Sequence, residues 1–290
     1  MRAEIIFNPT AGRGRAAAIA STVQKSLAKR GLDTQLHVTE KSGDATTLAC
    51  AFAGNADIVV AVGGDGTVNE IANGLACSPT SLGIVPAGTV NVLALELGLP
   101  FQVERACNVI AEGRTIAMDL GKANGRRFVL MTGIGVDALT VRNVDPRAKR
   151  MFRELAFLST GLRLGFTTHP TPFLVRANGE EHTAIFAVIG NSRYYAGRLG
   201  MTSSADPTDG VLDLIMFTGR SRAALASFWL GVPSGLHMRH PETVYVLTEK
   251  AEITPIEKED VVWFQTDGEL AGRIPVTVEV EPHALNVLVP

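Results

Sequence analysis

The fold of this chain is decided by the stretch Ala56-Asp57-Ile58-Val59-Val60-Ala61-Val62-Gly63-Gly64-Asp65-Gly66-Thr67-Val68-Asn69-Glu70. A β-branched run that ends in three glycines within four residues predicts a buried strand entering a tight turn, because glycine takes positive φ and has no Cβ to block a ligand. The residues from Thr67 onward predict a helix whose N-terminal N–H groups favour an anion such as phosphate. Phosphates would repel Asp65 unless a cation bridges them, which suggests a nucleotide with Mg²⁺.

Two other stretches have the same strand–loop–helix character. They are Phe7–Arg15, which contains Asn8-Pro9-Thr10-Ala11-Gly12, and Val85–Asn91, which contains Pro86-Ala87-Gly88-Thr89. Neither the dinucleotide spacing Gly-x-Gly-x-x-Gly nor the Walker ending Gly-Lys-Ser/Thr occurs at residues 63–67. Because ligands of open α/β sheets bind at the carboxyl ends of the strands, we expect the three loops to meet at one edge of a parallel sheet.

The pattern of expected elements changes near residue 115. Strands are expected at 3–8, 34–39, 58–62 and 82–85, and helices at 16–30, 44–53, after the glycine loop and at 103–111. This alternation indicates a parallel α/β sheet. Later segments predict short antiparallel strands, with Asn124-Gly125 as a hairpin turn and strands at 173–178, 182–189, 211–217, 243–248, 261–265, 276–280 and 285–289. We therefore expect an α/β domain over residues 1–118 and a β domain over 119–290.

Five segments together resemble the diacylglycerol kinase catalytic family, and more narrowly its soluble bacterial lipid kinases, which are similar to sphingosine kinases. They are Asn8–Gly12, Gly63–Glu70, Pro86–Asn91, Ser204–Asp213 and Thr266–Glu269. The resemblance covers essentially the whole chain in order. It implies a three-layer α/β domain with a parallel sheet, a C-terminal antiparallel β-sandwich that receives the lipid, and a last strand that returns to the first domain.

The resemblance assigns ATP binding to the three loops. The implied cofactor-binding residues are Asn8, Gly12, Arg13, Thr39, Gly63, Gly64, Asp65, Gly66, Thr67, Val68, Asn69, Glu70, Gly88, Thr89 and Asn91. From the sequence alone, Thr39 also fits an ordinary strand-end residue, and Arg13 also fits a solvated loop arginine.

Two magnesium sites are implied. Asp65 would act on the catalytic Mg²⁺, with Asp119 supporting it. Family members commonly follow Gly-Thr-x-Asn with Asp, whereas here Val92 stands at that position, so one carboxylate of the usual network is missing. A structural Mg²⁺ is implied at Asp206, Asp209 and Val211, since a hard cation prefers oxygen ligands. An ion-free Asp-Gly turn is the alternative there.

The catalytic base is expected in Thr266-Asp267-Gly268-Glu269. A lipid hydroxyl is a poor nucleophile, and a carboxylate within hydrogen-bond reach can accept its proton as it attacks. We expect Asp267 to remove the proton, with Glu269 essential to the site or itself the acceptor. A plain hairpin turn is the alternative, because Asp-Gly is also a strong turn signal.

These observations predict a Mg²⁺- and ATP-dependent lipid kinase acting on diacylglycerol or a sphingoid-type lipid. An NAD kinase-like enzyme is the first alternative, since Gly-Gly-Asp-Gly-Thr is shared with NAD kinases. A catalytically silent nucleotide- or lipid-binding regulator is the second, and Val92 favours it.

The expected partner is a lipid at a membrane surface. The net charge of −2 offers no case for nucleic acid, and a homodimer is left open. The basic, apolar segment 142–166 is a candidate for peripheral membrane contact, and the apolar segment 223–236, with Phe228 and Trp229, is a weaker second candidate. No uncharged apolar run reaches about 18 residues, so we expect a cytoplasmic protein that can lie at the inner face of the membrane.

Overall fold

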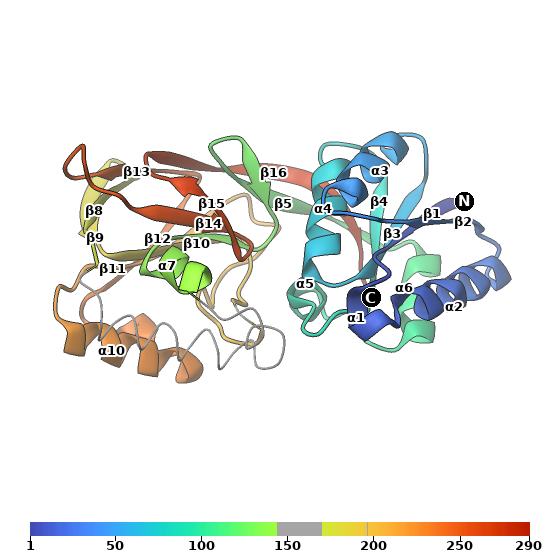
Figure 1. Cartoon of the computed structure of the whole chain (residues 1–290), viewed down its shortest axis with the longest axis horizontal. Helices are drawn as coiled ribbons and strands as arrows, with labels where there is room; N and C mark the ends of the chain where they lie inside the picture. The colour runs from blue at the N-terminus through green and yellow to red at the C-terminus, as the bar shows by residue number, and fades with distance from the viewer. Residues whose placement is uncertain (144–169, 196) are drawn as a thin grey trace. The chain divides into compact units, whose positions relative to one another are not determined.

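The computed structural model describes residues 1–143, 170–195 and 197–290, apart from the side chain of Arg13. The chain forms two compact units (Figure 1). One contains Met1–Asp119 and Pro282–Pro290, and the other contains Leu120–Glu281. The expected membrane segment 142–166 lies almost wholly outside the described residues. None of the helices in the described ranges is both long enough and apolar enough to cross a membrane.

The first unit is a three-layer α/β structure. Its parallel strands lie in the order β2-β1-β3-β4, and the end of β16 adds to β4 in parallel, with Val287 opposite Leu82. The strands are β1 (Arg2–Phe7), β2 (Asp33–Val38), β3 (Ile58–Gly63) and β4 (Ser81–Pro86). The helices are α1 (Ala11–Gly14), α2 (Ala16–Lys29), α3 (Asp44–Phe52), α4 (Asp65–Leu75), α5 (Val92–Glu96) and α6 (Val103–Glu112).

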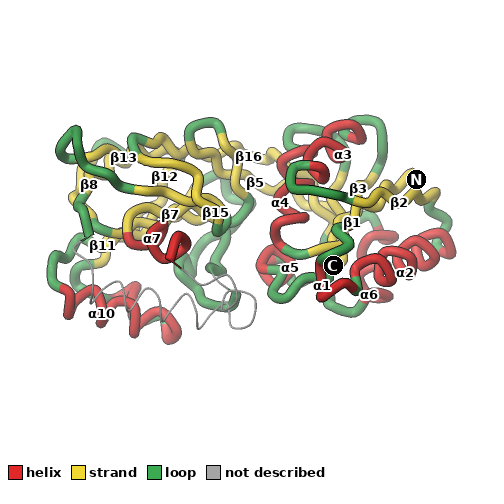
Figure 2. The backbone as a smooth tube through the Cα atoms, viewed as in Figure 1, coloured by secondary structure: helices red, strands yellow, loops and turns green. Residues whose placement is uncertain are grey.

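Helices cover both faces of this sheet. α2 and α6 lie side by side against one face, where Val23, Leu27 and Ile110 pack on Ile5 and Val60. α3 and α4 pack against each other and against β1, β3 and β4 (Figure 2). Every residue of β3 is buried, as expected for a parallel strand covered on both faces. The expected strands and helices of this unit form within one or two residues of their predicted bounds.

The second unit consists mainly of antiparallel strands. One sheet has the order β12-β11-β10-β7-β14-β15. In the other, β13 pairs with β16 and β8, β8 pairs with β9, and β5 pairs with β6 and β16. The elements are β5 (Thr115–Ala123), β6 (Arg126–Phe128), β7 (Met131–Gly135), α7 (Val136–Asn143), β8 (Phe173–Ala177), β9 (Glu180–Ala184), β10 (Phe186–Gly190), β11 (Leu212–Phe217), α10 (Arg222–Gly231), η1 (Val232–Ser234), η2 (Leu236–Arg239), β12 (Thr243–Thr248), β13 (Lys250–Pro255), β14 (Trp263–Thr266), β15 (Glu269–Arg273) and β16 (Val276–Leu288).

Alternate residues of the central strands supply two cores. Ala187 and Ile189 of β10 join the core between the sheets, whereas Phe186 and Val188 join a second core formed with α10. This period-two pattern explains why β10 and β11 read as nearly continuous apolar runs. The fold is thus the predicted one: a mostly parallel α/β sheet followed by an antiparallel β domain.

Several strands of the second unit differ from the sequence prediction. The expected strand 182–189 spans two separate strands, β9 and β10, and the sequence did not predict β7, β13 or β15. The expected strands 276–280 and 285–289 are a single strand, β16. Its start pairs with β13 and its end pairs with β4, so each half has a different partner. Pro282 and the positive φ of His283 lie between the halves, and these features make the sequence read as two strands.

Candidate functional site

The three predicted loops meet in the first unit at the carboxyl ends of β1, β3 and β4. The carbonyl of Gly63 accepts hydrogen bonds from the backbone N–H groups of Ala87 (2.9 Å) and Gly88 (3.0 Å). A Cβ on Gly88 would lie 2.5 Å from the Cα of Gly64, and one on Gly12 would lie 2.4 Å from the carbonyl oxygen of Ala87. Backbone therefore packs directly on backbone, which glycine alone permits.

Two asparagines fix the shapes of their own loops. Asn91, buried and at φ 57°, accepts a hydrogen bond from the N–H of Gly88 (3.2 Å) and donates one to its carbonyl (3.1 Å). Asn8 accepts hydrogen bonds from the N–H (3.0 Å) and hydroxyl (2.8 Å) of Thr10. Thr89 is exposed between the fixed points of its loop. The Arg13 side chain lies outside the described part.

Asp65 begins α4 and links the second loop to the third. Its Oδ1 accepts a hydrogen bond from the backbone N–H of Val92, 2.5 Å away, at the start of α5. The Val92 side chain is buried. At the position where the family commonly has a second acid, this chain therefore contributes a backbone donor to Asp65 and an apolar side chain to the core.

Gly66, in the first turn of α4, has no steric reason to be glycine. A Cβ there would meet no atom within 4 Å, its φ lies outside the positive range, and the residue is exposed. Glycine within a helix costs about 1 kcal/mol relative to alanine. Close approach of a ligand to the backbone is one of the roles for which proteins use glycine.

Other residues expected to bind the cofactor support the loops through their side chains. The Glu70 carboxylate accepts hydrogen bonds from the Ser42 hydroxyl (3.1 Å) and the Ala45 N–H (3.2 Å) at the start of α3. Asn69 accepts from the Asn73 side chain (3.2 Å), and the Thr39 hydroxyl donates to the carbonyl of Phe7 (3.4 Å). Thr67 and Val68 are buried.

Asp119 is fully buried and ends the Met1–Asp119 part of the first unit. Its side chain is hydrogen-bonded to β16, the last strand. Its Oδ1 accepts a hydrogen bond from the backbone N–H of His283 (2.6 Å), and the Nδ1 of His283 lies 3.7 Å away. Asp119 thus fastens the returning end of β16.

Asp267 and Glu269 share a hairpin of the second unit but occupy different environments. Asp267 and Gly268 are the two turn residues between β14 and β15. The Asp267 carboxylate accepts hydrogen bonds from the N–H groups of Val129 (2.8 Å), Leu130 (2.9 Å) and Met131 (3.0 Å). Glu269 is exposed and pairs with Arg126 at 2.8 Å.

The Asp206–Val211 loop is built of local turns. Asp206 Oδ1 accepts from the N–H of Thr208 (3.0 Å), and Asp209 Oδ1 accepts from the N–H of Val211 (3.1 Å). The pKa of nearby Asp213 is raised to about 6, mainly by burial and also by the charges of Asp209 and Asp206, while the hydrogen bond from the Tyr245 hydroxyl opposes the rise. The charges of Asp209 and Asp206 thus disfavour the ionised form of Asp213, and a bound cation would offset this effect.

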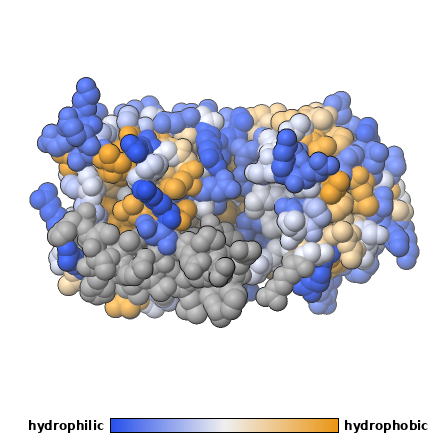
Figure 3. Space-filling model, viewed as in Figure 1, coloured by the Kyte–Doolittle hydropathy of each residue, from blue (hydrophilic) through white to orange (hydrophobic). Residues whose placement is uncertain are grey.

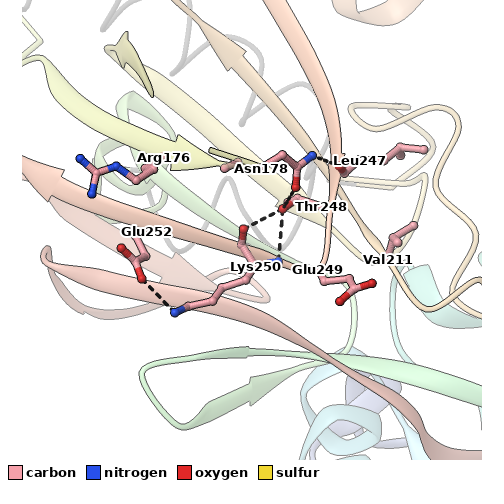
Figure 4. Close-up of a pocket in the computed structure, with 9 residues that line it drawn as sticks. Arg176, Asn178, Val211, Leu247, Thr248, Glu249, Lys250 and Glu252 are labelled. Atoms are coloured by element: carbon pink, nitrogen blue, oxygen red, sulfur yellow. Dashed lines mark hydrogen bonds and ion pairs between the residues drawn. The ribbon is translucent and has the colours of Figure 1, made fainter. Parts of the chain in front are cut away.

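The second unit also has a cavity of about 500 Å³, lined mainly by residues of β8, β12 and β13 (Figure 4). Val211 is the one lining residue that was also expected at a site. Three of the cavity's four charged lining residues are ion-paired, with Lys250 bound to Glu252 at 2.9 Å and Arg176 bound to Glu181 at 2.8 Å; Glu249 is the fourth.

The sequence prediction missed Asp137, a fully buried acid that contacts Gln265 beside the hairpin. The available signal was a single carboxylate within the apolar run Val129–Leu139. A lone acid there reads equally well as the first-turn residue of a helix, so its buried contacts could not be foreseen.

The first-unit residues fit a nucleotide with Mg²⁺. Gly66 gives close access to backbone, the first turn of α4 offers N–H groups, and Asp65 offers a carboxylate. The Asp206–Val211 loop offers carboxylates and backbone carbonyls, and in the described ranges no three His, Cys, Asp or Glu side chains cluster as a metal site. Any ion there would take backbone oxygens as well.

Comparison with known proteins agrees across the whole chain. Residues 2–123 match the diacylglycerol kinase catalytic domain, and residues 131–289 match the YegS C-terminal NAD kinase beta sandwich-like domain. A diacylglycerol kinase from Staphylococcus saprophyticus is 31% identical over 94% of this chain and 90% of its own. One from Staphylococcus aureus is 30% identical over 100% and 92%.

A solved structure has the same fold. The crystal structure of a putative diacylglycerol kinase from Bacillus anthracis superposes with a TM-score of 0.85 and 26% identity, covering 100% of this chain and 95% of that one. The structural similarity extends through both units, and so do the matches to the family models and to the two Staphylococcus sequences. The chain therefore belongs to the diacylglycerol kinase family of lipid kinases.

Proposed function

We propose that this protein transfers the γ-phosphate of ATP to the hydroxyl of a lipid in a Mg²⁺-dependent reaction, with diacylglycerol as the leading acceptor and a sphingoid-type lipid as the second. The observation that carries the proposal is Gly66, a helical glycine that the protein's own packing does not require, placed where three loops meet. The relatives named diacylglycerol kinase support the choice of acceptor.

The first unit's residues would bind and orient the phosphates. Phosphoryl transfer needs positioning and charge neutralisation more than covalent chemistry. The N–H groups at the start of α4 would bind phosphate oxygens, and Asp65 would hold Mg²⁺, which when bound neutralises charge developing on the phosphates. Asn91, Glu70 and Thr39 hold the loops in place through the contacts described above.

The two hairpin carboxylates suit different tasks. A general base must offer a lone pair to the hydroxyl, and three of about four lone-pair positions on Asp267 already accept backbone N–H groups. Glu269 is exposed beside Arg126. These contacts favour Glu269 as proton acceptor and Asp267 as the residue that orients the turn, the reverse of the expected assignment.

The decisive experiment measures phosphate transfer from γ-labelled ATP into diacylglycerol, a sphingoid base and NAD, with and without Mg²⁺. Asp65→Asn keeps an acceptor for the Val92 N–H but removes the charge, so we expect near-native thermal stability and about a 100-fold loss of kcat. Labelling of NAD rather than lipid would replace this proposal with the NAD kinase-like alternative.

Variants of the hairpin identify the base. We expect Glu269→Gln to lower kcat about 100-fold at unchanged Tm, and Asp267→Asn to lower both kcat and Tm by disturbing the turn. A native kcat in Glu269→Gln, together with a stable but inactive Asp267→Asn, would return the role of base to Asp267.

A catalytically silent regulator is the second candidate, and Val92 is the observation that favours it. The buried valine leaves the start of α5 without a carboxylate beside Asp65. ATP binding measured by calorimetry, with no transfer to any lipid in the panel, would support this candidate.

We also propose that the acceptor is taken from a membrane surface. Of the apolar residues in the candidate segment 223–236, Phe228 and Trp229 are buried in the core, whereas Leu230 and Leu236 are exposed. In the face that Figure 3 shows, apolar residues are interspersed with hydrophilic ones. Co-sedimentation with anionic vesicles should weaken in Leu230→Glu/Leu236→Glu; unchanged binding would exclude this contact.

A further inference from the structure

Asp137 is a buried carboxylate of the second unit that the proposed chemistry does not use. It lies in the first turn of α7 and is 0% exposed. Its Oδ1 accepts a hydrogen bond from the Tyr195 hydroxyl, and its Oδ2 accepts one from the side-chain amide of Gln265 at 2.9 Å. Both donors are neutral. Burial raises the pKa of Asp137 to about 6, although the two hydrogen bonds lower it. Such a group costs folding free energy, which an apolar residue would not.

The neighbouring strand is adapted to this carboxylate. Gly133 of β7 pairs with Gln265 of β14. A Cβ on Gly133 would lie 1.6 Å from Asp137 Oδ2 and 2.8 Å from Gln265 Nε2. Because Gly133 has no side chain, the Asp137 carboxylate has room to reach the Gln265 amide.

The side chain of Gln265 also forms a hydrogen bond with the hairpin turn. Its Oε1 accepts a hydrogen bond from the backbone N–H of Gly268 at 2.7 Å. Because a backbone N–H can only donate and an ionised carboxylate can only accept, the orientation of the amide is fixed. A continuous chain of hydrogen bonds thus runs from buried Asp137 through the buried Gln265 amide to the partly buried turn, whose residues Asp267 and Gly268 have φ of 48° and 82°.

We propose that Asp137 is a positioning residue that holds, through Gln265, the turn carrying Asp267 and Glu269 in the geometry that phosphate transfer requires. This inference rests on the proposed function. The N–H groups of residues 129–131 fix the Asp267 side of the turn, and Gln265 fixes Gly268. Losing the second anchor would weaken the hold on the turn next to Glu269, and a displacement of about 1 Å can cost about 100-fold in rate.

Two substitutions at Asp137 separate positioning from charge. Asp137→Leu removes both hydrogen bonds, so we expect kcat to fall about 100-fold, with KM for ATP within about twofold of native. In Asp137→Asn, the introduced amide oxygen would still accept from Gln265, while the amide nitrogen donates to the Tyr195 oxygen, because a hydroxyl can accept as well as donate. Asp137→Asn should therefore keep kcat within about threefold of native.

The matched control is Thr140→Val in the same helix. Thr140 is also fully buried, but its hydroxyl donates within α7, to the Val136 carbonyl at 2.8 Å. We expect near-native kcat. Equal losses in Thr140→Val and Asp137→Leu would attribute the effect to α7 as a whole and overturn the inference.

A double-mutant cycle tests the route through Gln265. If Asp137 acts through that amide, Asp137→Leu combined with Gln265→Met will be no slower than the slower single variant. Losses that multiply, or a native kcat in folded Asp137→Leu, would contradict the inference. Asp137→Ser, which ends one bond short of the carboxylate oxygens, is the second breaking variant if Asp137→Leu does not fold.

Hydrogen exchange at the Gly268 amide gives a readout that needs no activity. In the ¹⁵N-labelled full chain, Asp137→Leu should speed exchange at Gly268 at least about tenfold, whereas Asp137→Asn should not. If the native protein phosphorylates no lipid, the proposed function fails, but this comparison still decides whether Asp137 anchors the turn. Unchanged exchange in Asp137→Leu would overturn the inference.

Discussion

At Asp137, stability depends on pH with the sign opposite to that of an ion-paired carboxylate. Burial raises its pKa from the usual value of 3.8 to about 6 in the folded chain, so the folded chain binds a proton more readily than the unfolded one. The free energy of unfolding of the native protein relative to Asp137→Asn should therefore rise by about 1 kcal/mol from about pH 7.5 to about pH 5. Urea unfolding of both proteins at the two pH values measures this. A difference that stays constant or falls would show that the carboxyl titrates normally.

Val92 is the second residue whose effect can be isolated. Because its N–H bonds to Asp65 and its side chain is buried, Val92→Asp would place two carboxylates close together at low exposure. We expect a loss of several kcal/mol in unfolding free energy without Mg²⁺, partly recovered when millimolar Mg²⁺ binds between them. Thermal unfolding with and without Mg²⁺ checks this, with the native protein as control. A variant that is stable and insensitive to Mg²⁺ would show that this position does not face a metal.

At the scale of elements, the strand–loop–helix turns owe their geometry to contacts between loops. Gly88→Ala would force a Cβ to within 2.5 Å of the Gly64 Cα, and backbone cannot yield cheaply. We expect Gly88→Ala to lower both Tm and ATP affinity. Gly66→Ala, which meets no atom within 4 Å, should keep or raise Tm while lowering ATP affinity about tenfold or more. Thermal unfolding and calorimetric titration with ATP measure both. Unchanged ATP affinity in Gly66→Ala would remove the main support for the proposed phosphate site.

For the whole molecule, the end of the chain is part of the first unit's core. Leu285, Val287 and Leu288 are buried there, and their burial contributes about 5–8 kcal/mol, which is comparable to the stability of a typical domain. Deleting residues 282–290 should therefore abolish cooperative unfolding of residues 1–119, as limited proteolysis and circular dichroism would show. Deleting Pro290 alone, an exposed residue, is the control. A truncated protein that resists protease would show that the four remaining strands suffice.

The sequence by itself determined the strands and main helices of the first unit, most strands of the second, and the three loops. These features depend on local patterns: β-branched runs, helical periodicity, and glycine or Asn-Gly turns. Only the tertiary structure decided what the site side chains contact. Asp267 lies among N–H groups more than 130 positions away in sequence, Asp65 receives the N–H of Val92, and Asp137 reaches Gln265. Such pairings arise when distant strands and helices pack together, and no local pattern records which partner a buried carboxylate will meet.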